Sequence, residues 1–327
     1  MLTIKKITTG VHLVCSDSNM PWKCNGLLIR SDNGRVVLID CNFDDEELKE
    51  LFVYANRKPE RYYITHVHVD HVINVHRIET QNIPIYCPKP EDRYIVNGEL
   101  FMEESGAPQY RVLEEMKSFL FDFAGFKNIN KVNPYEQTDI YVFDNIEIKP
   151  IHLPGHSPGH SGFIVRDLKG NERPVLFSSD MGIEKIGMWY GFKYSNISDI
   201  RSSLKMIEAI YESEDFILTG SHTEVFFRKQ SQIFKIVEDK IKNSKMKILA
   251  LMEGKSSITP DELVFKGVYY KISSINKMDD INKKLYFFWE GYTIRNLMED
   301  LEYGGFITKS GNDKWKINYK NISKNVT

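Results

Sequence analysis

Eight of the nine histidines in this 327-residue chain fall in three places. The densest place holds three histidines and one aspartate within six residues, directly after the strand-like run Arg61–Ile64. Side chains two apart in an extended segment point the same way, so His66 and His68 project together. Asp70 and His71 follow where the chain turns into a helix. Imidazole and carboxylate suit zinc, iron or manganese, so this stretch predicts a site for two adjacent cations rather than a set of surface histidines.

The second stretch, residues 154–160, places two histidines in proline–glycine turns with the sequence PGHSPGH. Proline and glycine force tight turns at fixed places. A turn after the strand-like run Ile146–His152 therefore presents His156 rigidly, and we expect it to bind a metal. His160 lies one turn further on and is expected to hydrogen-bond to a ligand instead. His152 belongs to the strand, where a packing or supporting role is expected.

Two further strand-like runs end in residues of the same chemical type. The apolar pair Leu176–Phe177 leads through two serines to Asp180, and Ile217–Thr219 leads through a turn of small residues to His222. Each is a weak signal by itself, since a lone histidine or aspartate at a strand end is usually structural. Together with the two histidine stretches, they complete a set of five histidines and two aspartates.

The pattern HxHxDH, a later PGHSPGH, an aspartate after a strand and a final histidine resembles the metallo-β-lactamase fold superfamily. The resemblance covers roughly residues 1–230. It implies an α+β fold, a four-layer αββα sandwich of two mixed β-sheets with outer helices. The metals would lie along one edge of that sandwich.

The resemblance also implies a role for each matching residue. His66, His68 and His156 would hold one divalent cation, Asp70, His71 and His222 would hold the other, and Asp180 would bridge them. Asp40, which ends an apolar run, matches an early aspartate that supports the metal loop. Asp70 and Asp180 would be the catalytic carboxylates, which accept or relay the proton of a hydroxide shared by the two metals. Zinc is the expected metal, with iron or manganese as alternatives.

Departures from the family pattern argue against some of the activities found in the family. Thr223 follows the final histidine where glycine is usual, and Cys41 follows Asp40 where a small hydroxyl residue is common. True β-lactamases typically carry a cysteine at the position of Asp180, so antibiotic hydrolysis is not expected. The oxygen-reducing di-iron relatives carry a glutamate at the position of His68 and an added flavin domain, which favours hydrolysis over redox chemistry here.

The elements that must position these residues alternate between strand-like and helix-like segments over the first two-thirds of the chain. Asp32-Asn33-Gly34 predicts a hairpin turn, and a helix is expected over Phe43–Ala55. Residues from about 88 to 133 break the rhythm with helix-prone stretches, Glu91–Glu104 and Gln109–Phe123, and many aromatic residues. We expect a helical insertion that packs onto the main domain, with a lid over a pocket as the alternative.

Residues 235–327 have a different character, and we predict a domain boundary after residue 234. Helix-like segments are followed by two β-like segments around residues 310–313, which resembles the outline of a winged-helix module. This region has 17 Lys and Arg against 12 Asp and Glu, whereas the whole chain has a net charge of −2. The positive charge is compatible with RNA contact and equally with a homodimer or a substrate-side module.

Composition limits the class of protein to which this chain can belong. Hydrophobic residues make up 42% and charged residues 27%, as in ordinary globular proteins. No apolar run reaches the ~20 residues of a membrane span, and no signal peptide is recognisable. The four cysteines lack metal or disulfide spacing and are expected to be reduced thiols. These features predict a cytoplasmic protein with no membrane partner.

The leading hypothesis is therefore a dinuclear metal-dependent hydrolase of a small-molecule ester, thioester or lactone. The alternatives are an endoribonuclease or phosphodiesterase acting on RNA, and a regulatory protein with a vestigial metal site and a nucleic-acid-binding winged helix. The segment Gly187–Tyr194 follows Asp180 and is able to reach the metal edge. Trp189, Tyr190 and Lys193 are its candidate substrate-pocket residues, packing and solvation being the competing roles.

Overall fold

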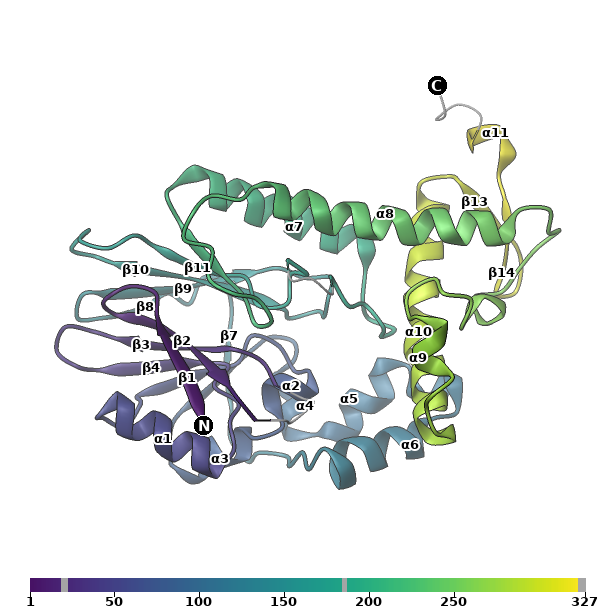
Figure 1. The fold of residues 1–327 in the computed structure, drawn as a ribbon. Coiled ribbons are helices and arrows are strands. Elements are labelled where there is room, and N and C mark those ends of the chain that lie inside the picture. The colour runs from purple at the N-terminus through teal and green to yellow at the C-terminus, as the bar shows by residue number, and fades with distance from the viewer. Residues whose placement is uncertain (19–22, 184–186, 323–327) are drawn as a thin grey trace.

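The structure is a computed structural model that describes residues 1–18, 23–183 and 187–322. It contains two mixed β-sheets stacked face to face (Figure 1). The first sheet has the order β1 to β7, antiparallel as far as β4 and parallel from β4 to β7. Its strands are β1 (Leu2–Lys6), β2 (Val11–Ser16), β3 (Gly26–Arg30), β4 (Val36–Ile39), β5 (Arg61–Tyr63), β6 (Ile85–Pro88) and β7 (Asn133–Tyr135).

The second sheet has the order β12-β11-β10-β9-β8, antiparallel except for the parallel pair β11 and β12. Its strands are β8 (Tyr141–Phe143), β9 (Ile146–His152), β10 (Ser161–Asp167), β11 (Val175–Phe177) and β12 (Ile217–Thr219). The predicted turn between β3 and β4 is present, and Gly34 there has the positive φ of 78° that a residue without Cβ adopts at no steric cost.

Helices cover the outer face of each sheet (Figure 1). The first sheet is covered by α1 (Asp45–Ala55), α2 (Val69–Val72) and α3 (Val75–Thr80), and the second by α7 (Ile197–Ser213) and α8 (Gln232–Met252). The predicted helix over Phe43–Ala55 begins two residues later, because the Asp44 side chain accepts the backbone N–H groups of Glu46 and Glu47 and caps it. The four-layer αββα architecture is confirmed.

Three hydrophobic clusters hold these layers together. One lies between the sheets and includes Leu27, Phe163 and Phe177. A second packs α1, α3 and the helices after β6 against the first sheet. The third runs without a break from the outer face of the second sheet, at Leu218, to Trp315 near the C-terminal end. The C-terminal helices therefore share a core with the second sheet.

The insertion after β6 is helical, but its helices are short. It comprises α4 (Asp92–Val96), α5 (Gly98–Ser105), the 3-10 turn η1 (Ala107–Tyr110), α6 (Leu113–Lys117) and the π-helical turn η2 (Ser118–Phe123). The two long helices expected there are interrupted for local reasons. Asn97 leaves helical geometry within the first of them and caps α5, and Arg111 has a left-handed φ of 56° within the second.

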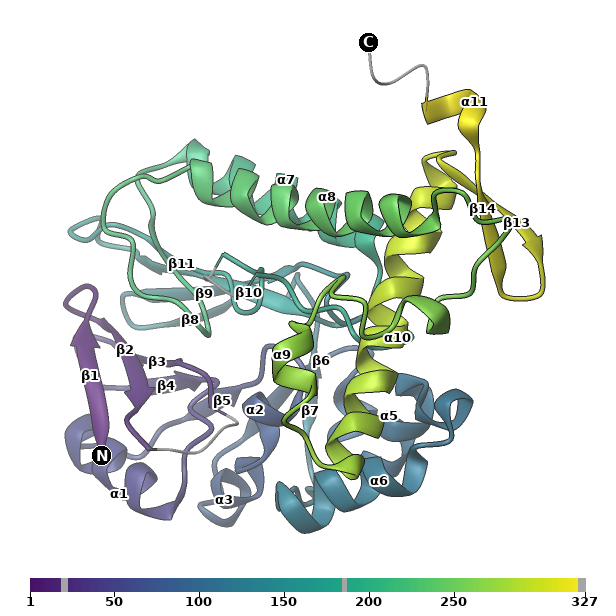
Figure 2. The same cartoon turned by 45° about the vertical axis from the view of Figure 1, so that its right-hand side comes forward.

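The C-terminal region contains α8, η3 (Asp261–Leu263), α9 (Ile272–Ile275), α10 (Asp280–Tyr303), the hairpin β13 (Ile307–Gly311) and β14 (Lys314–Ile317), and α11 (Tyr319–Ile322). The predicted boundary after residue 234 falls in the first turn of α8, which lies along α7, and α10 descends from α8 to the insertion helices α5 and α6 (Figure 2). The winged-helix relationship and the domain boundary stay predictions. No helix among the described residues is long and apolar enough to cross a membrane.

Candidate metal centre

Ligand-type side chains from five segments meet where strands of both sheets end. His66 and His68 follow β5, and α2 carries the next aspartate and histidine of the HxHxDH motif. His156 lies in the turn between β9 and β10, Asp180 follows β11, and His222 follows β12. The parallel pairs β4–β5 and β11–β12 bring carboxyl ends of strands to the same edge, which is a common place for a site in α/β folds.

Three histidines form the first ligand group. The ligand nitrogens of His66, His68 and His156 all lie within 4.8 Å of one another. Nε2 of His66 and Nε2 of His156 are 3.1 Å apart. All three rings are buried, and burial lowers the pKa of His66 and of His68 well below the ordinary histidine value and also lowers that of His156. The rings are therefore neutral and keep the lone pairs that a metal ligand needs.

Four residues form the second group, whose ligand atoms also lie within 4.8 Å of one another. Nε2 of His222 lies 3.0 Å from Oδ2 of Asp70 and 3.4 Å from Oδ2 of Asp180. Nε2 of His71 lies 3.3 Å from Oδ1 of Asp180. The same Asp180 reaches the first group, with Oδ2 3.6 Å from Nε2 of His156. Asp180 therefore faces both groups of ligands.

The donor atoms fit a metal pair. Nε2 of His71 and Oδ1 of Asp180 are buried and have no hydrogen-bond partner among the described residues. Two atoms that share one tetrahedral zinc at about 2.1 Å lie about 3.4 Å apart, and the spacings within the second group lie around that value. Imidazole and carboxylate donors in this proportion suit zinc, iron or manganese. The seven predicted ligands are thus brought together, while His76 and His12 lie elsewhere.

Asp40 supports the second group from behind. Its Oδ2 lies 2.9 Å from Nδ1 of His71 and also accepts the hydroxyl of Thr65 at 2.6 Å. Its other oxygen accepts the backbone N–H of Thr65 at 2.9 Å. The Nδ1–H of His71 is therefore taken by Asp40, which turns Nε2 toward the other ligands. The structure places Asp40 where the sequence predicted a supporting residue.

His160 hydrogen-bonds to the backbone of Asp180, and neither of its ring nitrogens is left to bind a metal. Its Nδ1 lies 2.9 Å from the carbonyl of Leu153, to which it donates, and its Nε2 accepts the backbone N–H of Asp180 at 3.1 Å. Burial lowers the pKa of His160 to about 3, so the ring is neutral. His152 donates from Nε2 to the carbonyl of Pro158 at 2.8 Å and braces the same turn.

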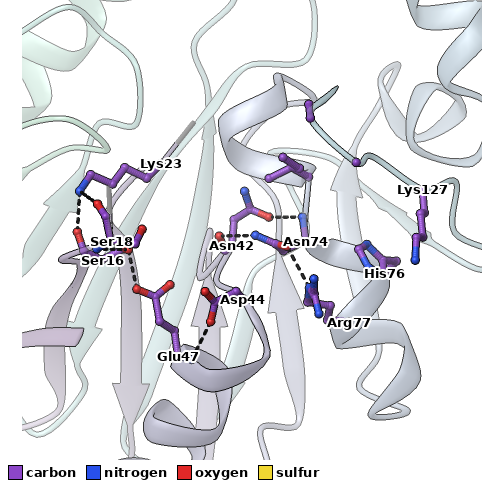
Figure 3. A pocket seen from close by; sticks show the side chains of 13 residues that line it. Ser16, Ser18, Lys23, Asn42, Asp44, Glu47, Asn74, His76, Arg77 and Lys127 are labelled. Atoms are coloured by element: carbon purple, nitrogen blue, oxygen red, sulfur yellow. Dashed lines mark hydrogen bonds between the residues drawn. The ribbon is translucent and has the colours of Figure 1, made fainter. Parts of the chain in front are cut away.

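Asn42 holds the backbone of the HxHxDH turn. Its Nδ2 donates to the carbonyl of Asp70 at 2.6 Å, and its Oδ1 accepts the backbone N–H of Asn74 at 2.7 Å. Figure 3 shows Asn42 and Asn74 joined in this way at the wall of a cavity of about 320 Å³. None of the seven ligand-type residues lines that cavity. The cavity lies on the outer side of the turn, and Asn42 is the lining residue that holds the turn from there.

Aromatic side chains enclose His68. The rings of Trp189 and Phe192 lie 5.4 and 5.3 Å from its ring, and Phe101 of the insertion lies 6.4 Å away. The hydroxyl of Tyr194 lies 3.3 Å from Nε2 of His68. The insertion and the segment after Asp180 therefore form one apolar wall beside the first ligand group. Such a wall limits the access of water.

The three predicted pocket residues lie in different places. Trp189 lines the wall, and its carbonyl accepts from Nδ1 of His156 at 2.6 Å. Tyr190 is buried in the cluster shared with the C-terminal helices, and its ring packs 5.7 Å from that of Tyr269. Lys193 is exposed, and its backbone N–H donates to the carbonyl of Ser105. Of the three, Trp189 alone contacts a ligand-type residue.

Two residues near the ligands gave no signal in the sequence. Glu91 begins the insertion, yet its carboxylate is buried between the two histidine loops. Tyr194 lies in a segment that the sequence marked as able to reach the metals, but nothing distinguished it there from its aromatic neighbours. Both contacts join residues far apart in the chain, so only their proximity in space reveals them.

A cavity of about 540 Å³ borders the segment after Asp180 at Met188 and at the predicted pocket residue Tyr190. Three lysines, Lys240, Lys247 and Lys271, line it, and no described acidic residue does. The hydroxyl of Tyr270, another lining residue, accepts the indole N–H of Trp189 at 3.0 Å. The cavity and the aromatic wall of the ligand groups are therefore linked through one side-chain contact.

Comparison with known proteins agrees with the family resemblance that the ligand-type residues carry. A family model described as the metallo-beta-lactamase superfamily matches residues 19–218. The hydroxyacylglutathione hydrolase GloC of Haemophilus influenzae is 25% identical over 222 residues, covering 64% of this chain and 92% of that protein. An uncharacterised protein of Aquifex aeolicus is 22% identical over 201 residues, which is 59% of this chain and 81% of that protein.

Two solved structures share the fold over nearly the whole chain. A metallo-beta-lactamase family protein from Thermus thermophilus has a TM-score of 0.71 and 17% identity, covering 96% of this chain and 100% of that one. A beta-lactamase domain protein from Burkholderia ambifaria has a TM-score of 0.69 and 17% identity, covering 96% and 93%. Because both coverages exceed the sandwich, the likeness includes the C-terminal helices.

Proposed function

Since the chain belongs to the metallo-β-lactamase superfamily of metal-dependent hydrolases, we propose that it is a dinuclear hydrolase that cleaves an ester, thioester or lactone bond in a small molecule. The observation that carries this proposal is the position of Asp180. Its Oδ2 lies 3.4 Å from Nε2 of His222 and 3.6 Å from Nε2 of His156, so one carboxylate serves both ligand groups. We assign His66, His68 and His156 to one metal, Asp70, His71 and His222 to the other, and Asp180 to both.

Two divalent cations bound there would supply Lewis acidity and, by lowering the pKa of water towards about 7, hydroxide at neutral pH. The residues of the chain prepare for that chemistry. Asp40 fixes the ring of His71, and His160 fixes the backbone of Asp180. Asp70 and Asp180 offset part of the cation charge and provide oxygens that can hold the proton released by water.

Two observations support a chemical class of substrate. The GloC relative is a hydroxyacylglutathione hydrolase, which supports an acyl compound as the substrate class here. The cavity of about 540 Å³ has Lys271 and Lys247 in its lining, and positive charge there favours a molecule with an anionic group. We therefore place anionic acyl thioesters first among the candidates, and zinc first among the metals.

The test is a substrate panel on protein reconstituted separately with zinc, manganese and iron. It comprises ester, thioester and lactone substrates in anionic and neutral forms, and a phosphodiester. Close to two metals per chain and chelator-sensitive turnover of an acyl substrate are expected. Metal analysis that finds no bound ion, with turnover that survives the chelator, would refute the proposal.

RNA cleavage is the second candidate, favoured by the excess of Lys and Arg in residues 235–327. Phosphate contacts make RNA affinity fall steeply with salt. The same panel separates the candidates, because an RNA-cleaving enzyme turns over the phosphodiester and binds RNA at low salt. A metal-free protein without turnover would instead agree with the regulatory alternative.

A further inference from the structure

We propose that Glu91 is a positioning residue that locks together the two loops of the first ligand group and thereby sets the affinity of that group for its metal. This inference rests on the proposed dinuclear site. Glu91 precedes α4 in the insertion and is 1% exposed. Both of its carboxylate oxygens accept hydrogen bonds from the two loops, and it belongs to neither ligand group, so its action on the site passes through these loops.

The carboxylate of Glu91 joins segments that are far apart in the chain. Its Oε2 accepts the backbone N–H of Val67 at 2.6 Å, and Val67 stands between His66 and His68. Its Oε1 accepts the hydroxyl of Ser157 at 2.5 Å and the backbone N–H of Gly159 at 2.6 Å. One side chain thus fixes the HxHxDH loop with one oxygen and the loop of His156 with the other.

Glu91 packs tightly against the loop of His156, so a small displacement of its side chain also moves that loop. A Cβ placed on Gly159 would lie 3.1 Å from Cγ and Oε1 of Glu91 and 3.1 Å from the carbonyl of Lys89. A buried carboxylate is costly unless its lone pairs are occupied, and three short, charge-assisted hydrogen bonds occupy them here. Both loops are therefore fixed relative to one rigid group, which keeps the three histidine nitrogens within 4.8 Å.

The substitution Glu91→Gln keeps the size of the side chain but turns one acceptor oxygen into a donor. That NH₂ group must then face either the N–H of Val67 or the donors of Ser157 and Gly159. One loop is released, and a change in groups that orient metal ligands typically weakens metal binding by roughly 10–100-fold. The second ligand group does not touch Glu91 and keeps its affinity.

Glu290 offers a matched control. It is fully buried, and its carboxylate also accepts three hydrogen bonds, from the backbone N–H groups of Phe265 at 2.9 Å and of Tyr269 and Tyr270 at 3.3 Å each. None of these partners belongs to a loop that carries a ligand. Glu290→Gln therefore imposes the same chemical change on a buried carboxylate, with loss of stability but without release of a ligand loop.

The experiment measures both zinc affinities of the full-length chain by competition with a chromophoric chelator, with folding checked by circular dichroism. His68→Ala, which lacks one ligand of the first group, identifies the affinity that belongs to that group. We expect Glu91→Gln to weaken it by roughly 10–100-fold while the other affinity, and both affinities of Glu290→Gln, stay within about threefold of wild type.

Wild-type affinity in Glu91→Gln, or an equal loss in Glu290→Gln, would overturn the positioning role and leave the dinuclear site standing. If Glu91→Gln does not fold, Ser157→Ala removes one of the three donors and leaves the carboxylate intact. A selective loss at the first group is expected there as well, and its absence would count against the inference. A wild-type chain without zinc binding would instead overturn the proposed function itself.

Discussion

The backbone N–H of Asp180 donates a hydrogen bond of 3.1 Å to Nε2 of His160. Because Nδ1 of His160 donates to the carbonyl of Leu153, both ring nitrogens are engaged. His160 therefore has no nitrogen free for a metal, although it belongs to the same PGHSPGH stretch as His156. Its effect on the site comes through the backbone of Asp180, the residue that faces both ligand groups.

Replacing His160 by alanine is expected to lower kcat/KM by roughly 10–100-fold, because the loop that carries Asp180 loses its anchor. Steady-state kinetics with the panel substrate that is turned over best provide the measurement. His76→Gln is the control, since His76 lines the cavity in Figure 3, away from the ligands, and should retain wild-type activity. Equal activity in His160→Ala and His76→Gln would contradict this account.

Substituting Asp180 itself should lower the activity more than substituting His160. Asp180→Ala is expected to lower turnover by at least about 100-fold and to reduce the metal content per chain, because both ligand groups lose a donor. The circular dichroism spectrum should stay that of the wild type. His68→Ala should behave in the same way. Full activity with two bound metals in either variant would show that the ligands are assigned wrongly.

Metal binding is expected to release protons. Burial disfavours the charged ring of His222, but the neighbouring Asp180 and Asp70 outweigh it and raise the pKa of His222 to about 12 in the metal-free protein. A metal binds only the unprotonated ring, so it must displace this proton at any pH below about 12. Zinc affinity should therefore rise with pH, by up to about tenfold per unit for each proton displaced. Calorimetry in buffers of different ionisation enthalpy counts the protons, and pH-independent affinity would contradict the prediction.

The lysine-lined cavity predicts a selective effect on substrate binding. Lys271→Ala should raise KM for anionic acyl substrates several-fold and leave kcat and neutral substrates nearly unchanged, because it removes one positive charge from the lining. Lys193→Ala is the matched control, an exposed lysine of the segment after Asp180 that does not line the cavity. An equal rise in KM for the neutral substrates would show that the effect is not electrostatic.

Deleting residues 235–327 is expected to abolish cooperative unfolding rather than to yield an isolated catalytic domain. Asn296 of α10 donates to the carbonyls of Tyr190 and Phe192, and Asp300 pairs with Arg201 of α7 at 2.9 Å. The third hydrophobic cluster continues through the same helices. Thermal unfolding of the truncated chain tests this expectation, which a sharp transition would contradict. A test of RNA binding should therefore substitute exposed lysines instead of removing the region.

The sequence by itself determined the identity and order of the ligand-type residues and the hairpins, and the family resemblance that these residues carry implied the αββα fold. The residue patterns themselves are local. Alternation fixes which side chains of a strand share a face, as for His66 and His68, and Pro-Gly turns fix where His156 projects. The insertion was foreseen as helical, but its breaks at Asn97 and Arg111, where the backbone leaves helical geometry, were not.

Only the tertiary structure showed that Glu91 supports the ligands, and which atoms the predicted supporting residues Asp40 and His160 contact. The carboxylate of Glu91 reaches loops 24 and 66 residues away, and Asp180 meets His160 across 20 residues. Tyr190, which the sequence proposed for the substrate pocket, packs into a core shared with the C-terminal helices and also lines the cavity of about 540 Å³. Such contacts depend on how the sheets and helices pack against one another. A local pattern of residue types carries no information about partners so distant in the chain.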